Sequence, residues 1–409
     1  MSLFLRLALR NVFRNRARTA VALLAIAVGC AALIVNGGVI YNIFTELRED
    51  AIRGRHGHLQ IYAAGFVEHH YEQPGGYMIS KDDTERVLEL LAELPEVQRA
   101  TRQREFSGMI ASGDRYVAFV GIGVEPEHDA EFSRQATMRA GEPLSADDPY
   151  GMIAGLGLAR KFDGKPGTVV TLMTNTDSGA LNATDARLRG VFEGGMKAYD
   201  DWTLKLPLLA TEELLLDDRT ERIIVLLDRV ESVEPVRVSL AQAFSREGLN
   251  VEMREWRDLA LFHNQTVSLF NRELDVIKLI VATIVILGIA NTIGMSILER
   301  RIELATLRAL GLKRGAVGRL LLTEALFTGL IGGLLGIGLG ALFSTVITAI
   351  GIPFPSPPGS TKPFLGGVDF IPGIAVFAFT LSVVATLLAA LLPVWRTTRR
   401  PIAETLRGA

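Results

Sequence analysis

Residues 279–313 read LIVATIVILGIANTIGMSILERRIELATLRALGLK. They join an uncharged apolar stretch to a charged stretch, which contains Gly311 near its end. Residues 279–298 have the length of a helix that crosses a hydrocarbon layer roughly 30 Å thick. In the remainder, apolar residues alternate with arginine and glutamate as in a short amphipathic helix, which Gly311 ends as a C′ residue. The segment therefore predicts a membrane span followed at once by an exposed helix.

Three further uncharged stretches, 19–44, 325–352 and 370–395, are long enough to span a membrane. Backbone groups in hydrocarbon must bond to one another, so each stretch is expected to be helical. Buried helices of a soluble protein are the alternative, which the occurrence of four such stretches disfavours. The predicted fold is an α-helical membrane protein with four transmembrane helices, arranged one plus three around a large α+β extracytoplasmic domain.

Charge is divided unevenly along the chain. Residues 43–278 carry 27 Lys and Arg against 40 Asp and Glu, whereas the other residues carry 16 against 5. Arginines cluster before the first span, between the second and third, and after the fourth, which predicts that these segments and both termini are cytoplasmic. The acidic region then lies outside, in the periplasm if the membrane is an inner membrane, and its charge argues against nucleic acid or another anionic polymer as a partner.

The predicted organisation follows from these spans. The expected segments are a cytoplasmic amphipathic helix at 1–18, transmembrane helix 1 at 19–44, an extracytoplasmic α+β domain with a helical stem at 45–275, transmembrane helix 2 at 276–298, a cytoplasmic coupling helix and loop at 299–319, transmembrane helix 3 at 320–352, an outer loop at 353–369, transmembrane helix 4 at 370–395 and a cytoplasmic tail at 396–409.

Within the outer region, short β-rich runs alternate with helical ones. Strands are expected at 58–63, 115–124, 168–174, 187–192 and 223–228, and helices at 82–94, 151–162, 211–216 and 235–247. Residues 252–278 read as one helix that continues into the second span, and residues 45–53 as an extension of the first. Such a pair of helices is either a rod that carries motion or a plain rigid stem.

Two local patterns leave alternatives open. Residues 27–30, Ala-Val-Gly-Cys, resemble a lipoprotein cleavage site, but the apolar run continues to Phe44, which favours a membrane anchor. The only histidine cluster, His56, His58, His69 and His70, lacks the defined ligand spacing of a zinc site. Because no Gly-x-Ser-x-Gly, His-Glu-x-x-His or Walker-type motif occurs, the chain is not expected to be an enzyme or to hold a metal or cofactor itself.

The third span is rich in glycine at spacings that let helix backbones approach closely. We expect these residues to pack within the four-helix bundle or across a two-subunit interface: Gly329, Gly332, Gly333, Gly336 and Gly340. Glu324, near the cytoplasmic end of this span, is expected to pair with a nearby arginine such as Arg319 or Arg308.

The charged segment also carries a family resemblance. Together with Leu-Ala-Leu-Arg-Asn at 7–11, residues 299–311 resemble the permease subunits of the MacB/FtsX/LolC-LolE superfamily of ABC transporters, in which such a Glu-Arg-Arg-x-Glu loop is followed by a glutamate and a glycine-rich span. The resemblance implies a coupling helix that binds an ABC ATPase subunit, which in turn binds ATP and Mg. The residues implied in that contact are Glu299, Arg300, Arg301, Glu303, Leu304, Leu307, Arg308, Leu310 and Gly311.

The resemblance also sets an expectation about function. The sequence is most like the lipoprotein-releasing permeases, without a fused ATPase domain, and residues 181–209 add a weaker similarity to them. The expected role is therefore a permease that passes ATP-driven motion to its outer domain to extract or export lipoprotein or another hydrophobic cargo. Expected partners are a second permease copy or paralogue, membrane lipid and a periplasmic carrier or adaptor protein.

Two other functions remain as alternatives. An FtsX-like regulator would activate an extracytoplasmic partner without transporting a substrate, although its outer domain is typically smaller. A membrane-tethered enzyme or sensor is disfavoured because no catalytic constellation stands out and because an anchor does not need four spans. The sequence leaves open the cargo, the direction of transport and whether the permease is a homodimer or a heterodimer.

Overall fold

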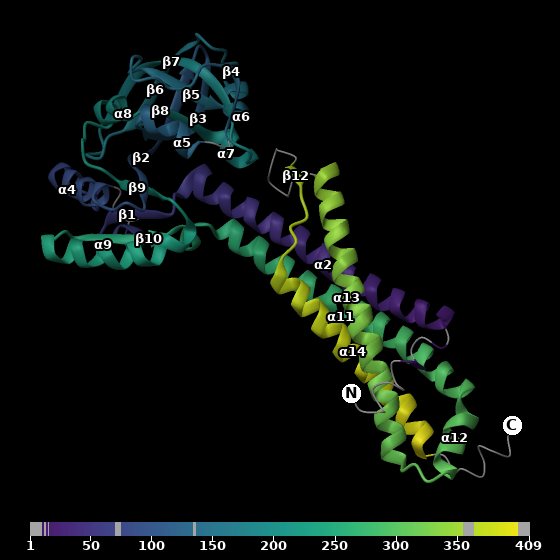
Figure 1. Cartoon of the computed structure of the whole chain (residues 1–409). Coiled ribbons are helices and arrows are strands. Elements are labelled where there is room, and N and C mark those ends of the chain that lie inside the picture. Colours follow the sequence, from purple (N-terminus) through teal and green to yellow (C-terminus); the bar gives the residue numbers. More distant parts are fainter. Residues whose placement is uncertain are drawn as a thin grey trace. The chain divides into compact units, whose positions relative to one another are not determined.

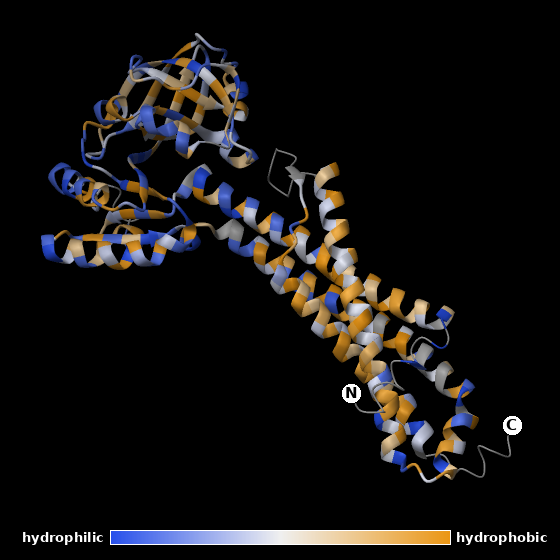
Figure 2. Cartoon of the chain, in the orientation of Figure 1, coloured by the Kyte–Doolittle hydropathy of each residue, from blue (hydrophilic) through white to orange (hydrophobic). Residues whose placement is uncertain are grey.

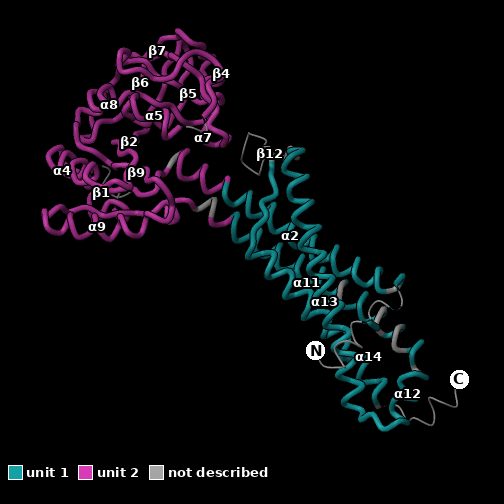
Figure 3. The backbone as a smooth tube through the Cα atoms, in the orientation of Figure 1, with its two compact units in different colours: residues 1–45, 266–354, 365–409 teal, residues 46–265, 355–364 magenta. Residues whose placement is uncertain are grey.

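The computed structural model describes residues 10–11, 14, 16–69, 75–133, 136–354 and 364–399. The chain divides into two compact units, which Figure 3 colours separately. The helical unit comprises Met1–Thr45, Thr266–Phe354 and Leu365–Ala409, and the sheet unit comprises Glu46–Gln265 and Pro355–Phe364. The amphipathic helix and the tail predicted for the two ends of the chain lie largely outside the described residues.

Long helices form the helical unit (Figure 1). They are α2 (Arg16–Ala51), α11 (Leu261–Glu299), α13 (Arg314–Ile350) and α14 (Pro372–Arg399), with the short α12 (Arg301–Ala309) between α11 and α13. Among the described residues, three segments are long and apolar enough to cross a membrane: Thr19–Gly54, Arg314–Ile350 and Pro372–Thr398. The second predicted span lies inside α11, several of whose side chains are outside the described set.

Hydrophobic residues occur along most of the length of these helices (Figure 2). Two core clusters join them, one around Ile26, Ile289 and Ala389 and one around Cys30, Ile34 and Ala378. The predicted outer loop contains the short strands β11 (Ile352–Phe354) and β12 (Phe364–Gly366), which pair with each other. Asn42 of α2 lies beside this segment, since its Oδ1 accepts a hydrogen bond from the Gly367 amide at 3.3 Å.

The sheet unit is built on one continuous sheet in the order β10-β1-β9-β2-β3-β8-β5-β7-β4, with β6 bridging β2 and β7. Its strands are β1 (Leu59–Ala63), β2 (Val97–Ser112), β3 (Arg115–Val124), β4 (Thr137–Gly141), β5 (Gly151–Gly155), β6 (Val169–Asn175), β7 (Leu181–Glu193), β8 (Thr203–Pro207), β9 (Arg222–Leu227) and β10 (Val251–Glu255). Because β6 closes the path from β7 back to β2, strands β2, β3, β8, β5, β7 and β6 form a barrel.

Two cores hold the sheet unit together. The barrel interior is filled by a cluster that includes Phe106, Phe119, Leu172, Leu188 and Leu204, none of them more than 8% exposed. Outside the barrel, the strands β10, β1 and β9 continue the sheet, and their apolar face is covered by two helices. These are α4 (Lys81–Ala92) and α9 (Val233–Glu247).

Shorter helical segments connect the strands. They are the π-helical turn η1 (Ile52–His56), α3 (Phe66–His69), α5 (Pro126–Phe132), α6 (Leu156–Lys161), α7 (Lys197–Trp202), α8 (Leu208–Leu215), the 3₁₀ turn η2 (Val230–Ser232) and α10 (Trp256–Leu259). The helix predicted at 151–162 is confirmed only in its second part, where α6 begins at Leu156. Its first part is wrong, because residues 151–155 form the buried strand β5.

The two predicted connecting helices have different outcomes. The extension of the first span is confirmed, since α2 continues to Ala51 and passes into η1. The continuous helix expected at 252–278 is wrong. Residues up to Glu255 pair with β1 as β10, α10 follows, and Ala260 breaks the helical path with φ −86° and ψ 60° before α11 begins.

Candidate functional site

The charged segment after α11 folds as the sequence predicts. Arg300 is the N-cap of α12, and the helix ends at Ala309. Gly311 then adopts φ +104°, a left-handed conformation that glycine enters without a Cβ penalty, and its amide donates to the Arg308 carbonyl at 3.1 Å. The turn sends the chain into α13, whose N-cap is Lys313.

One face of α12 is anchored within the helical unit. Leu304 is 2% exposed and Ala305 is 3% exposed. Leu304 packs in a cluster with Val317 and Leu321 of α13 and Val394 of α14. Leu304, which the family resemblance places in an ATPase contact, is therefore covered by its own chain.

The opposite face of α12 is open. Ile302 is 45% exposed and Leu310 is 80% exposed, and the intervening positions Thr306 and Ala309 are also exposed. Spacings of four and three residues put Ile302, Thr306 and Ala309 on one stripe of the helix, and Leu310 is the exposed C-cap residue that follows Ala309. Ile302, Thr306 and Ala309 were absent from the predicted contact set, although the helical period alone could have identified them.

The other predicted contact residues lie around this stripe. Leu307 and Arg308 are half-buried, Glu299 and Gly311 are exposed, and the side chain of Arg301 lies outside the described set. The exposed stripe Ile302, Thr306, Ala309 and Leu310 is called the α12 stripe below.

Polar contacts fix α12 at its N-terminal end. Arg300 reaches Glu303 at 3.4 Å and Glu324 of α13 at 3.0 Å. Asn11 donates to Glu324 at 2.6 Å, and Arg14 pairs with Glu303 at 3.0 Å. The partner expected for Glu324 was Arg319 or Arg308, whereas the structure places Arg300 there, because Arg300 faces α13 from the helix cap while Arg319 is exposed.

Five glycines of α13 face another helix at close range. A Cβ built on Gly332, Gly336 or Gly340 would lie 2.8 Å from Ile26, 2.5 Å from Cys30 or 2.9 Å from Ile34, all on α2. Gly329 meets Thr386 and Gly333 meets Phe379, both on α14. Gly338, by contrast, has open space at that position. The glycine set is thus split between the two neighbours of α13.

The histidine cluster of the sheet unit is dispersed. His58 is buried, and its Nδ1 accepts the amide proton of Leu227 at 3.0 Å. Burial, helped by the positive charge of Arg53, lowers the pKa of His58 from 6.5 to about 4. His69 stacks on Tyr77, and His70 lies outside the described residues. In the described part of the chain, no three His, Cys, Asp or Glu residues are placed to hold a metal ion.

Two family models match the chain. The MacB-like periplasmic core domain matches residues 19–243, more than half of the sequence, and the FtsX-like permease C-terminal model matches residues 276–402. Together they cover the sheet unit's barrel and the helices that follow it.

Two known proteins are similar to this chain in sequence, each at less than 30% identity. An uncharacterised ABC transporter permease of Methanocaldococcus jannaschii is 28% identical over 221 residues, which are 51% of this chain and only about half, 52%, of that relative. The lipoprotein-releasing system transmembrane protein LolE of Haemophilus influenzae is 22% identical over 90% of this chain and 89% of its own length.

Among solved structures, the periplasmic region of MacB from Actinobacillus actinomycetemcomitans is 16% identical and covers 53% of this chain and 95% of that one, with a TM-score of 0.38. The family of this chain is assigned from the two family models, which match residues 19–243 and 276–402. The chain belongs to the MacB/FtsX superfamily of ABC transporter permeases, with a MacB-like periplasmic core domain and an FtsX-like permease C-terminal region.

Proposed function

We propose that this chain is the four-span permease subunit of an ABC transporter and that a separate ATPase subunit binds the α12 stripe. The observation that supports the proposal is that α12 has one buried face and one exposed apolar face. Leu304 and Ala305 fix one face to the helical unit, while Ile302 and Leu310 expose apolar surface on the other. Because α12 is fixed on one side, its exposed apolar face is available to pack into a hydrophobic groove of another protein.

The anchoring explains how force would pass through the contact. The Arg300–Glu324 pair and the Leu304 cluster connect α12 to α13 and α14 on two sides of the short helix. A displacement imposed on α12 by nucleotide binding in the partner would therefore act on the long helices rather than bend a flexible loop. ATP and Mg bind in the partner ATPase in this proposal.

Binding to the ATPase is tested with Leu310→Glu and Ile302→Glu. Each places a charge within the proposed contact, and we expect at least a tenfold loss of affinity for the partner ATPase subunit. Leu216→Glu is the matched control, because Leu216 is 72% exposed in the sheet unit, outside α12. Equal co-purification of the ATPase with all three variants would refute the docking proposal.

The cargo proposed is a lipoprotein or another hydrophobic molecule, and the transporter is proposed to contain a second permease copy or a paralogue. The similarity to LolE along 90% of the chain supports this choice. The test measures ATP turnover by the full complex in nanodiscs with an acylated lipoprotein and with the same protein lacking its acyl chains. Stimulation by the acylated form alone is expected. No response to either, with intact ATPase binding, would instead favour an FtsX-like regulator.

A further inference from the structure

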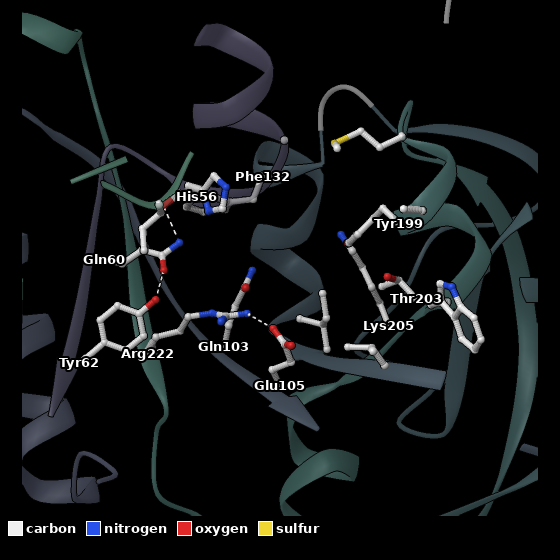
Figure 4. Close-up of a pocket in the computed structure, with 17 residues that line it drawn as sticks. His56, Gln60, Tyr62, Gln103, Glu105, Phe132, Tyr199, Thr203, Lys205 and Arg222 are labelled. Atoms are coloured by element: carbon white, nitrogen blue, oxygen red, sulfur yellow. Dashed lines mark hydrogen bonds and ion pairs between the residues drawn. The ribbon is translucent and has the colours of Figure 1, made fainter. Parts of the chain in front are cut away.

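A cavity of about 530 Å³ lies within the sheet unit, outside the barrel. Its floor is a single face of the sheet. Tyr62 pairs in register with Arg222, Arg222 pairs with Gln103, and on the neighbouring rows Glu105 pairs with Ile122 and Ile122 with Lys205. Cross-strand partners point to the same side of a sheet, so these side chains share one surface. Figure 4 shows Tyr62, Arg222, Gln103 and Glu105 together on this floor.

The floor is unusually polar for a buried surface. The opposite sides of the same strands carry Leu59, Phe106 and Leu204 into the two cores. On the cavity side, Gln103 is 8% exposed and Thr203 is 3% exposed. Neither side chain makes a hydrogen bond to another described residue, and neither contributes a fully buried unpaired atom, so their polar atoms remain open to the cavity. The cavity thus presents polar groups whose bonding capacity is unused.

The charged groups of the floor are paired with groups of opposite charge in the protein, although the Nε of Arg222 is buried without a hydrogen-bond partner. Lys205 donates to Asp129 at 2.6 Å and also bonds Ser133. Arg222 lies 3.1 Å from both Glu105 and Glu221. Although burial opposes the charges of Lys205 and Arg222, their carboxylate neighbours outweigh it and raise the pKa of both. An added anion or cation would have to disrupt these pairs, so the site favours an uncharged ligand.

The other walls of the cavity are largely apolar. The cavity is also lined by Phe132 of α5, Leu259 of α10, and Met196 and Tyr199 at α7. Figure 4 labels Phe132 and Tyr199 among them. The volume falls in the range of small-molecule sites, which combine apolar walls with a few convergent polar groups. A molecule with hydrogen-bonding groups on one side and hydrocarbon on the other would complement both surfaces.

The cavity also touches the two chain segments that connect the sheet to the long helices. Gly54 and His56 belong to η1, which follows α2, and Leu259 belongs to α10, which precedes α11 after a break at Ala260. A bound molecule would therefore contact both connections at once.

We propose that this cavity binds an uncharged amphipathic small molecule and that the segments 52–56 and 256–260 become more rigid when it is occupied. Amides or hydroxyls of the ligand bond Gln103 and Thr203, and its apolar side packs on Phe132 and Leu259. This site is distinct from the α12 stripe, and its occupancy does not require the ATPase.

The test uses the full chain in lipid nanodiscs, with empty nanodiscs as the blank. Hexyl β-D-glucoside is the neutral probe, and hexyl sulfate and hexyltrimethylammonium are its charged counterparts. Saturation-transfer difference NMR is expected to give at least tenfold tighter binding for the glucoside than for either charged probe. Hydrogen exchange at 52–56 and 256–260 should slow when the glucoside binds.

Two variants make the test specific. Gln103→Leu combined with Thr203→Val removes the unused polar groups, and we expect binding of the glucoside to weaken at least tenfold, in keeping with the loss of two neutral hydrogen bonds. Gly54→Phe fills the cavity from η1, since a Cβ at Gly54 meets nothing within 4 Å, and should abolish binding. Gln242→Leu, on the exposed side of α9, is the control and should bind as the wild type does.

Thermal unfolding of each variant shows whether it is folded. Unchanged glucoside binding in both cavity variants, or equal binding of the charged probes, would overturn the proposal. Binding without slower exchange at 52–56 and 256–260 would overturn the proposed rigidification of the connecting segments.

Discussion

Glu324 illustrates how a single carboxylate can organise the end of a membrane helix. It accepts a hydrogen bond from Asn11 and pairs with Arg300, each at close range and with little exposure of the ion pair. A buried ion pair adds little stability over an apolar pair of similar size, but removal of one partner leaves an uncompensated charge. Because Arg300 is the N-cap of α12 and Glu324 belongs to α13, the pair can form only when α12 packs against α13 in this orientation.

Arg300→Met is therefore expected to destabilise the helical unit by about 2–4 kcal/mol, and the double variant R300M/E324M to recover most of that loss. The measurement is the midpoint of thermal unfolding in detergent. Arg319→Met serves as the control, because Arg319 is exposed on the same helix as Glu324 and should change the midpoint little. Equal effects of Arg300→Met and the double variant would show that the pair is not coupled.

His58 makes the sheet unit sensitive to acid. Its pKa of about 4 in the folded chain lies below the unfolded value of 6.5, so protonation favours unfolding. The stabilising contribution is present above pH 6.5 and is lost as the pH falls toward 4, by an amount on the order of 3 kcal/mol.

In His58→Asn, the side-chain oxygen can still accept the Leu227 amide without titrating in this range. We expect hydrogen exchange at Leu227 to accelerate between pH 6.5 and 4.5 in the wild type, after correction for intrinsic rates, and much less in the variant. The same acceleration in both proteins would assign the acid sensitivity to other groups.

At the scale of elements, α13 depends on glycine wherever it meets α2. Gly332, Gly336 and Gly340 are spaced by one turn, and each faces a side chain of α2 at less than 3 Å from the position of a built Cβ. Such spacing allows backbones to approach so closely that packing and weak hydrogen bonds replace the hydrophobic effect as the source of helix association.

Gly336→Val should force α2 and α13 apart and lower the unfolding midpoint markedly, with a cost of roughly 1–3 kcal/mol or more from overpacking. Gly338→Val changes the same residue type two positions away, where nothing lies within 4 Å, and should have little effect. Similar midpoints for the two variants would show that the close approach at Gly336 is not required.

The extent of sequence-based prediction also differs by element. Uncharged length identified the long helices, and the β-rich run at 115–124 identified β3 with its bounds unchanged. The helix predicted at 82–94 is α4, and the Ser80 hydroxyl at its N-cap accepts the Asp83 amide at 3.1 Å. These signals are local, so they do not depend on how the chain folds back on itself.

The missed elements depend on distant partners. Residues 151–155 and 252–255 were predicted as parts of helices, yet both are strands whose pairing partners, β7 and β1, lie far away in the sequence. The candidate site shows the same limit. The period of α12 predicted a helix with an apolar face, but only packing against Val317 and Val394 decides that Leu304 is covered and Leu310 is free.

At the scale of the whole chain, both connections cross the boundary between the units as helices, but they differ in how far the helix continues into the sheet unit. The helix α2 runs from Arg16 to Ala51, passes the unit boundary after Thr45 and leads into η1, which ends at His56. The helix α11 crosses the boundary at Gln265 and Thr266, and the helical path is broken at Ala260, within the sheet unit. A continuous helix transmits rotation and displacement over its length, whereas a non-helical residue permits the two sides to reorient. If the units exchange motion, α2 is the stiffer link.

Insertion of Gly-Ser-Gly between Thr45 and Glu46 should therefore uncouple the two units more severely than the same insertion between Ala260 and Leu261. In the full complex, we expect the first variant to bind the ATPase normally and to lose most cargo stimulation of ATP turnover, because α12 is untouched while the rod is interrupted. The second should retain a larger part of the stimulation, since the chain already bends there. If both insertions reduced cargo stimulation equally, the two connections would contribute equally to the coupling. If both variants kept full stimulation, the coupling would not pass through these helices.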